Sequence, residues 1–546
     1  MKNFKLFIII VLLCYPTFSQ KLFSSVLPES YTRNSVTVFF VDYPGANHWS
    51  RTREKISQIE FSDKFDNHNL ETLFLRPGFS RDNLRMPADV EDAFLNDLKK
   101  LDVGRKVIAK WYNRQADGTM DMELVHQRGR FAATDADYFA ASSTSRGDAA
   151  LQDMGNELVN KSFVLIIDLR NIRNMSETEN ASTLRGWTAQ MSAHLYRVDF
   201  NDEVRYALYE TWIYEDDSPE VKRQKREAFD SMEFPLEHVA NVSLVLPSTV
   251  NSTQTRRLGT KSEDQLLQEL VQKAYEDVIF ELERRVEAFK VVTPLYERRP
   301  PRAKIGLKEG LRTDYRFFVY EHVYNRRTNT VEPVRRGVIR AGRSSRIHDN
   351  RHEAYGDMGT SQFYQVAGRR LEQGYTIVQR NDMGFEITLG GEVGGLEGFY
   401  SRLDYRTGRL TGIRALFVYV DLGVGSGYNR FVSDKNFTLL SVSGGLAKGM
   451  QLTRNMELRP YAGFGLESAS NDDFSEDNAI RAYYVKPGVN LAMNLTHNFQ
   501  LIMGIGNYVF VTDAESEGAN FAPRPWDDIF TGRTGSSIMV GTKFMF

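Results

Sequence analysis

Cysteine is almost absent from this chain of 546 residues, because Cys14 is the only one. A single cysteine excludes an intramolecular disulfide and a cysteine-based metal site, and it argues against a disulfide-stapled extracellular module. Long hydrophobic runs are also missing: no stretch of about 18 apolar residues follows the N-terminus, which excludes a helical membrane protein. The formal net charge of −2 provides no global attraction to nucleic acid or to anionic lipid.

The composition is that of a folded protein, with 41% hydrophobic and 26% charged residues. A chain of this length is too long for one ordinary hydrophobic core, so about two to four domains are expected.

The N-terminus has the pattern of a secretory signal. Lys2 and Lys5 form a basic start, residues 6–14 form a short apolar core, and small residues precede Gln20. We therefore predict a signal peptide over residues 1–19, whose removal leaves no cysteine. A buried first strand and a lipoprotein signal are the alternatives, although Leu13 precedes Cys14 where a lipoprotein signal needs a small residue.

From Phe385 to the last residue, apolar and polar side chains alternate with a period of two. In residues 456–467, Met456, Leu458, Phe464 and Leu466 share one face, whereas Glu457, Arg459, Gly463 and Glu467 share the other. The alternating segments run for about 10 to 14 residues, which is the length that a tilted strand needs to cross a bilayer. Backbone groups in lipid must be paired, so such strands have to close into a barrel.

The turn spacing divides this region, 384–546, into eight strands. We predict strands at 385–394, 397–406, 411–425, 437–452, 456–469, 479–495, 499–512 and 535–546. Tight turns at 407–409, 453–455 and 496–498 alternate with longer polar links at 426–436, 470–478 and 513–534. In outer-membrane barrels the short turns are periplasmic, and an even strand count leaves both barrel ends on that side. The preceding domains are then expected in the periplasm.

Eight strands, short turns and the terminal Lys543-Phe544-Met545-Phe546 resemble the OmpA/OmpX-type barrels of Gram-negative outer membranes. The resemblance implies outer-membrane lipid and the barrel-assembly machinery as partners, with Phe544 and Phe546 as the assembly signal. A soluble lipocalin-like barrel is the alternative, but it would need apolar residues inside, where this sequence places the polar ones.

Helices and strands alternate in residues 20–290, which predicts one or two α/β domains with a mixed sheet. The clearest helix starts at Ser262, which forms a capping box with Gln265 before a run of apolar residues at 3.6-residue spacing. Residues 162–168 predict a buried strand. The alternation in residues 188–200 and 204–214 predicts a hairpin.

A Pro-Pro step flanked by charge predicts a linker at 291–303. The segment that follows, Lys304 to Glu321, contains a short strand, a Gly turn and a longer strand, which favours a small SH3-like β module over 304–382. The segment also resembles SH3-like modules of flagellar and curli-associated periplasmic proteins.

The segment from Glu297 to Arg351 is strongly basic, with 15 Lys and Arg against 6 Asp and Glu. The candidate residues for binding an anionic partner are Arg335, Arg336, Arg340, Arg343 and Arg346. Peptidoglycan carboxylates, lipid phosphate and an acidic protein surface are suitable partners. Nucleic acid is not expected for a periplasmic domain, and a solvated basic strand pair is the plainer interpretation.

Motifs for catalysis or metal binding are weak. His348 and His352 have the spacing of metal ligands on a helix but lie in a polar loop. Arg146-Gly147-Asp148 matches an adhesion tripeptide, but a motif this short arises by chance. The sequence has no Gly-x-Ser-x-Gly, phosphate loop or dinucleotide fingerprint. We therefore expect no enzyme activity, no cofactor and no metal.

These patterns together predict a multidomain α+β protein: a periplasmic α/β region, a small SH3-like β-barrel and a C-terminal eight-stranded antiparallel transmembrane β-barrel. The expected function is an outer-membrane anchored binding or scaffold protein that holds cell wall or a secretion partner. A small channel or export accessory is the alternative, and an outer-membrane hydrolase or acyltransferase is a third.

Overall fold

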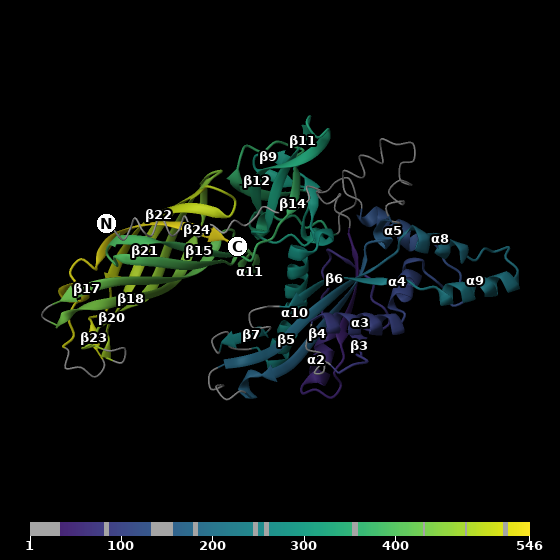
Figure 1. Cartoon of the computed structure of the whole chain (residues 1–546), viewed down its shortest axis with the longest axis horizontal. Coiled ribbons are helices and arrows are strands. Elements are labelled where there is room, and N and C mark those ends of the chain that lie inside the picture. Colours follow the sequence, from purple (N-terminus) through teal and green to yellow (C-terminus); the bar gives the residue numbers. More distant parts are fainter. Residues whose placement is uncertain are drawn as a thin grey trace.

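A computed structural model shows three parts in chain order: an α/β domain, a β module and a C-terminal β-barrel (Figure 1). The structure describes residues 33–80, 87–132, 155, 157–177, 184–243, 249–255, 261–351, 359–429, 432–474, 478–516 and 522–546. The predicted signal peptide 1–19 and the tripeptide at 146–148 lie outside these residues. Within the described ranges, no helix is both long and apolar enough to cross a membrane.

The α/β domain is built on a mixed sheet with the strand order β2-β1-β4-β5-β6; β3 pairs with β1, and β7 with β5. Its strands are β1 (Ser35–Val41), β2 (Asp66–Asn67), β3 (Phe74–Leu75), β4 (Ser162–Asn174), β5 (Leu184–Val198), β6 (Leu236–Ser243) and β7 (Thr249–Thr255). Its helices are α2 (Trp49–Ile56), α3 (Pro87–Lys100), α4 (Val103–Trp111), α5 (Glu123–Ala132), α8 (Asp202–Glu210), α9 (Pro219–Ser231) and α10 (Glu263–Arg285). β1 and β4 are parallel, whereas β5 is antiparallel to β4 and β6. The predicted mixed sheet is confirmed.

Helices cover both faces of this sheet. On one face, α10 and α2 pack over one hydrophobic core, and on the other face α3, α4 and α5 pack over a second core. α10 begins where the sequence predicts, since the Ser262 side chain accepts from the Gln265 N–H and the Gln265 side chain accepts from the Ser262 N–H. Its apolar positions, among them Leu267 and Leu270, are fully buried.

The predicted hairpin at 188–200 and 204–214 is wrong in its second half. Residues 202–210 form helix α8, because the Asn201 side chain caps the helix by accepting a hydrogen bond of 3.0 Å from the Val204 N–H. Asp202 and Glu203 then place negative charge in the first turn, where the helix dipole favours it.

The β module is a seven-stranded antiparallel sheet with the order β8-β14-β11-β12-β13-β10-β9. Its strands are β8 (Val292–Pro294), β9 (Glu297–Arg298), β10 (Pro301–Ala303), β11 (Arg316–Asn325), β12 (Thr330–Ala341), β13 (Ser361–Gly368) and β14 (Thr376–Gln379). Residues 291–303 are therefore not a linker but supply three strands of the sheet. The module has its own core, and its SH3-like character stays a prediction.

The C-terminal region forms a closed, eight-stranded antiparallel barrel, in which β15 pairs with β24 and β20 with β21. The barrel strands are β15 (Phe385–Gly394), β16 (Gly398–Arg406), β17 (Leu416–Asn429), β18 (Ser433–Lys448), β20 (Met456–Ser470), β21 (Ile480–Asn494), β22 (Phe499–Phe510) and β24 (Gly535–Met545). Short strands β19 (Met450–Thr453) and β23 (Glu515–Ser516) and one-turn helices α11 (Gly408–Thr411) and α12 (Trp526–Ile529) lie in the links. All eight predicted strands are confirmed.

The two faces of the barrel wall differ as the alternation predicts. Side chains such as Val420, Phe464 and Ile505 are about half exposed on the outside, at 47%, 54% and 62%. Inward-facing Arg459 and Glu467 are buried, at 1% and 0%. An apolar outer belt around a closed barrel with a polar interior is the arrangement of a transmembrane barrel. The β module lies at the end of the barrel where β15 begins and β24 ends, which we call the near rim (Figure 1).

Candidate functional site

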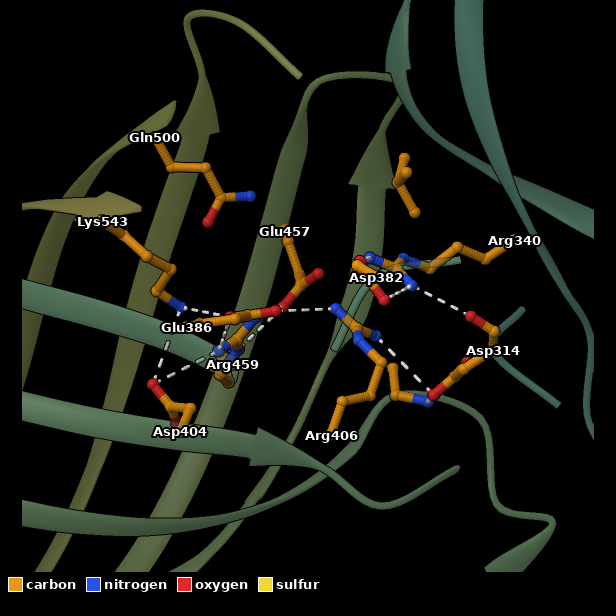
Figure 2. A network of polar contacts seen from close by, with 12 residues as sticks. Asp314, Arg340, Asp382, Glu386, Asp404, Arg406, Glu457, Arg459, Gln500 and Lys543 are labelled. Atoms are coloured by element: carbon orange, nitrogen blue, oxygen red, sulfur yellow. Dashed lines mark hydrogen bonds and ion pairs between the residues drawn. The ribbon is translucent and has the colours of Figure 1, made fainter. Parts of the chain in front are cut away.

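Buried charges fill the barrel lumen at the near rim. The carboxylate of Glu386 on β15 accepts from Arg406 on β16 at 2.8 Å, from Arg459 on β20 at 2.8 Å and from Lys543 on β24 at 3.0 Å. All four side chains are at most 6% exposed. Each comes from an inward position of its strand, so closing the barrel brings them together across the lumen (Figure 2).

The β module continues this network beyond the barrel. Asp314, in the turn before β11, lies 3.7 Å from Arg406, and its carboxylate accepts from the Tyr364 hydroxyl and the Ala415 N–H at 2.7 and 2.8 Å. Arg340 on β12 donates to the Asp314 carbonyl at 2.9 Å and pairs with Asp382, which precedes the barrel (Figure 2). The module thus covers the near rim and supplies Asp314 as a partner for the lumen residue Arg406.

The electrostatics of Asp382 show how tightly this junction is paired. Burial alone would raise the pKa of Asp382, but Arg340 and Arg316 outweigh it and lower that pKa to about 2. Arg316 lies 3.4 Å from the same carboxylate. A buried ion pair that loses one partner leaves an uncompensated charge, which costs about 3–5 kcal/mol.

Three near-rim turns of the barrel touch the module. Gly412 accepts from the Ser344 N–H at 3.1 Å, and the Asn455 side chain accepts from the Gly368 N–H at 2.8 Å. In the third turn, the His497 ring packs edge-on against Phe318, with centroids 5.3 Å apart. Burial, together with nearby arginines, lowers the pKa of His497 to about 4. The module is therefore held around the rim and not by a single strand.

The rest of the lumen is also occupied by paired groups. Arg402 donates to Asp404 at 3.0 Å and stacks 3.6 Å from the Tyr419 ring centroid, while Lys486 lies 3.2 Å from Asp421. At the opposite end, which we call the far rim, Trp526 of α12 folds inward and packs with Phe437, Phe510 and Phe530. The described lumen side chains form a plug of ion pairs and aromatic rings.

A second buried ion pair joins the module to the α/β domain. Lys64 donates to Glu283 of α10 at 2.8 Å and to Gln379 of β14 at 3.0 Å. Glu283 also accepts from Gln379 and from Asn381, at 3.0 and 3.2 Å. Lys64 has no exposed side-chain surface, and burial lowers its pKa against the opposing effect of Glu283. Polar contacts therefore connect all three parts.

The five predicted arginines occupy different environments. Arg340 is only 3% exposed and paired, so its assignment to a partner-binding surface is wrong: it belongs to the junction. Arg336 pairs with Glu321, and Arg335 stacks 5.0 Å from the Phe318 centroid near His497. Arg343 and Arg346 are exposed. Arg335 is exposed as well, but its guanidinium lies over the Phe318 ring, whereas Arg343 and Arg346 line a groove.

Arg343 and Arg346 line a groove of about 570 Å³ between the module and the barrel. Its barrel side carries two cationic residues that the sequence pattern does not single out, Arg414 and Lys448. The Lys448 ammonium donates to the Arg414 carbonyl, and the Arg414 guanidinium lies 4.5 Å from the Tyr364 ring centroid. Their positions beside near-rim turns of the barrel are the one feature of the sequence that could have marked them as groove residues. We call these four residues the basic groove.

Metal-ligating side chains gather elsewhere. Within the residues that the structure describes, Glu91, His194 and His238 form the group of three that can share an ion. Of the pair singled out in the sequence, His352 lies outside the described residues, and the His348 N–H donates to Ser361 at 2.9 Å.

Comparison with solved structures finds outer-membrane barrels that each match 30% of this chain. No protein-family model and no curated protein matches the sequence. The N-terminal barrel domain of Pseudomonas aeruginosa OprF is 12% identical over 30% of this chain and 98% of that chain, with a TM-score of 0.20. The Yersinia pestis outer membrane protein Ail is 13% identical over 30% of this chain and 98% of that chain, with a TM-score of 0.19. A major outer membrane protein from Thermus thermophilus is 16% identical over 30% of this chain and 97% of that chain, with a TM-score of 0.21.

The class of the protein follows from its own geometry. A closed antiparallel barrel of eight strands, an apolar outer belt and a polar lumen define an outer-membrane β-barrel protein. The chain is an outer-membrane anchored protein in which a large N-terminal region precedes an eight-stranded barrel.

Proposed function

We propose that this protein is a non-catalytic scaffold that holds its α/β domain and β module in a fixed position on the periplasmic side of the outer membrane. The main support is a pair of buried polar clusters, one linking Glu386 in the lumen to Asp314 and Asp382, and the other linking Lys64 to Glu283. The two clusters meet in the chain, because Asn381, which donates to Glu283, directly precedes Asp382. A buried ion pair is stable only when its two partners keep a fixed geometry. Buried charges at both junctions therefore favour a rigid connection over a flexible tether.

The basic groove supports an anionic partner for this scaffold. Arg343, Arg346, Arg414 and Lys448 line it, and Ile413 beside them is 49% exposed. Cations next to exposed apolar side chains at a barrel rim lie at the height of lipid headgroups, where an anionic surface attracts them. The phosphate of a neighbouring lipid is therefore the partner chemistry that we favour over peptidoglycan carboxylates.

Two alternatives have less support. A conducting channel requires open space along the lumen, whereas the described lumen is filled by charge pairs and Trp526. Steady open currents in planar bilayers would overturn the scaffold proposal. A hydrolase would need a base at the membrane, but His497, the only histidine of the barrel sequence, lies in a near-rim turn against Phe318.

The direct test is crosslinking in intact cells from a photoreactive residue placed at Ser345, within the basic groove. We expect a lipid or cell-envelope adduct that is lost when Arg343 and Arg346 are changed to Gln. Arg298 and Arg370, which lie on the module outside the groove lining, provide the matched control when changed to Gln. Adducts that persist in the groove variant, or a module that reacts with reagents confined to the cell exterior, would contradict the proposal.

A further inference from the structure

Three metal-ligating side chains meet on one face of the α/β sheet, although they are far apart in the sequence. Glu91 comes from α3, His194 from β5 and His238 from β6. One ligand atom of each lies within 4.8 Å of the other two. Two imidazoles and one carboxylate are the ligand set of many catalytic zinc sites.

A β-bulge creates this meeting. β5 and β6 are antiparallel, with His194 opposite Asn241 and Tyr196 opposite His238, and the register shifts between Leu195 and Tyr196. Directly opposite residues share a face, so His238 and Asn241 both point to the α3 side, although their odd spacing would place them on opposite faces of a regular strand. The bulge therefore turns His238 toward His194.

The surroundings hold the carboxylate in place. The Asn241 side chain donates to one Glu91 carboxylate oxygen, and the other oxygen lies 3.5 Å from Nδ1 of His238. The Tyr196 hydroxyl donates to the Glu91 carbonyl at 2.8 Å, which fixes this turn of α3 against the sheet. Partners that orient a ligand in this way are a regular feature of metal sites.

Burial is graded across the three residues. His194 is 3% exposed beneath Phe94, whereas the side chains of Glu91 and His238 are 18% and 29% exposed. The site is anchored in the core and open on one side, so three protein ligands leave at least one position for water or another ligand.

We propose that Glu91, His194 and His238 bind one divalent transition-metal ion, with Zn²⁺ as the ion that this ligand set fits best. Two imidazole nitrogens disfavour Mg²⁺ and Ca²⁺, which prefer oxygen ligands. The bound ion joins α3 to β5 and β6, so it also stabilises the α/β domain. This inference is independent of the scaffold proposal, because the site lies away from the junction and the basic groove.

The test uses the full chain in detergent, stripped with a chelator and titrated with Zn²⁺ against a chromophoric competitor. We expect one equivalent of tightly bound Zn²⁺, X-ray absorption showing two imidazole ligands, and a rise in melting temperature that Mg²⁺ does not produce. His238→Ala and Glu91→Gln, at the two more exposed positions, are expected to abolish that binding. Asn241→Ala should weaken it by about 10- to 100-fold.

His48→Ala is the matched control, because His48 pairs with Glu177 at 3.1 Å outside this group. It should bind Zn²⁺ as the parent chain does. Failure of the parent chain to bind one equivalent, or unchanged binding in folded His238→Ala and Glu91→Gln chains, would overturn the proposal. Circular dichroism establishes that each variant is folded, so lost binding in a folded variant supports the site.

Discussion

At the level of single residues, the stability of the barrel depends on buried charges that have no access to water. Glu386 is the clearest example, because it accepts from two arginines and a lysine inside the barrel. Desolvating four charges is costly, and only their mutual pairing offsets that cost. The lumen is therefore sensitive to the loss of a single carboxylate.

Glu386→Gln should lower the stability of the barrel by about 3–5 kcal/mol, because it leaves three buried cations without their shared anion. The measurement is the temperature at which the folded, fast-migrating gel band converts to the unfolded band. Glu397→Gln, at an exposed position of the far rim, is the control and should match the parent protein. Adding Lys543→Met to Glu386→Gln should recover part of the loss. Identical conversion temperatures in all four proteins would show that the network does not stabilise the barrel.

Asp382 makes the junction sensitive to acid. Its pKa of about 2 lies below the ordinary value of about 3.9, so its ionised form stabilises the folded junction by about 2–3 kcal/mol. The sign follows from the lowered pKa: the stabilisation is complete above about pH 4 and is lost as the pH falls towards 2. Pepsin cleavage of the connection at 380–384 should therefore accelerate over this interval.

In Asp382→Asn this cleavage should already be fast at pH 4, whereas Asp349→Asn, which alters an exposed carboxylate, should behave as the parent protein does. Equal cleavage of Asp382→Asn and the parent at pH 4 would exclude a role for this ion pair in docking.

At the scale of elements, the barrel was predictable strand by strand, because lipid on one side and a polar lumen on the other impose a period of two. The same alternation is misleading at 204–214, where Asn201 caps a helix. The linker prediction failed because proline is tolerated in edge strands and at the first residue of a strand. β9 is the edge strand of its sheet, and Pro301 is the first residue of β10.

The sites were less predictable than the strands. Alternation shows that Glu386 and Arg459 point inward, but not that strands far apart in sequence bring them within 2.8 Å. The approach of Glu91 to His194 and His238 requires a register shift that no local pattern announces. Arg340 looked like its exposed basic neighbours, because its partner Asp382 follows much later in the chain.

His497, in the near-rim turn at 495–498, should make the docking of the module depend on pH in a second, milder way. The pKa of His497 is about 4 in the folded protein, against about 6.5 for a free histidine, because the ring is buried and lies near Arg335 and Arg316. Stability from the neutral ring is present above about pH 6.5 and is lost as the pH falls towards 4.

The urea concentration that releases the module to protease should consequently be lower at pH 5 than at pH 7. His497→Gln should reduce this difference, whereas His322→Gln, at an exposed position of β11, should preserve it. If the urea concentrations at pH 5 and pH 7 differed as much in His497→Gln as in the parent protein, the pH dependence would come from other groups.

At the scale of the whole molecule, two buried junctions align three folded parts along one path from the membrane to the α/β domain. Lys64 lies where the α/β domain meets the β module, since it contacts α10 and β14 together. Lys64→Met should speed hydrogen exchange at the end of α10 and in β14, because Glu283 is then buried without its cation. Lys100→Met, at the end of α3 where its side chain is 73% exposed, is the control. Unchanged exchange in Lys64→Met would mean that the α/β domain and module are coupled by other contacts.

The proposed topology places the outer belt of the barrel against lipid tails and the β module in water. Spin labels on single cysteines in a Cys14→Ser background test it in reconstituted bilayers. Labels at Val420 and Ile505 should be relaxed by oxygen and shielded from a water-soluble nickel complex, whereas a label at Val331, which is 60% exposed on β12, should show the reverse. Nickel access at Val420 and Ile505 equal to that at Val331 would contradict the account.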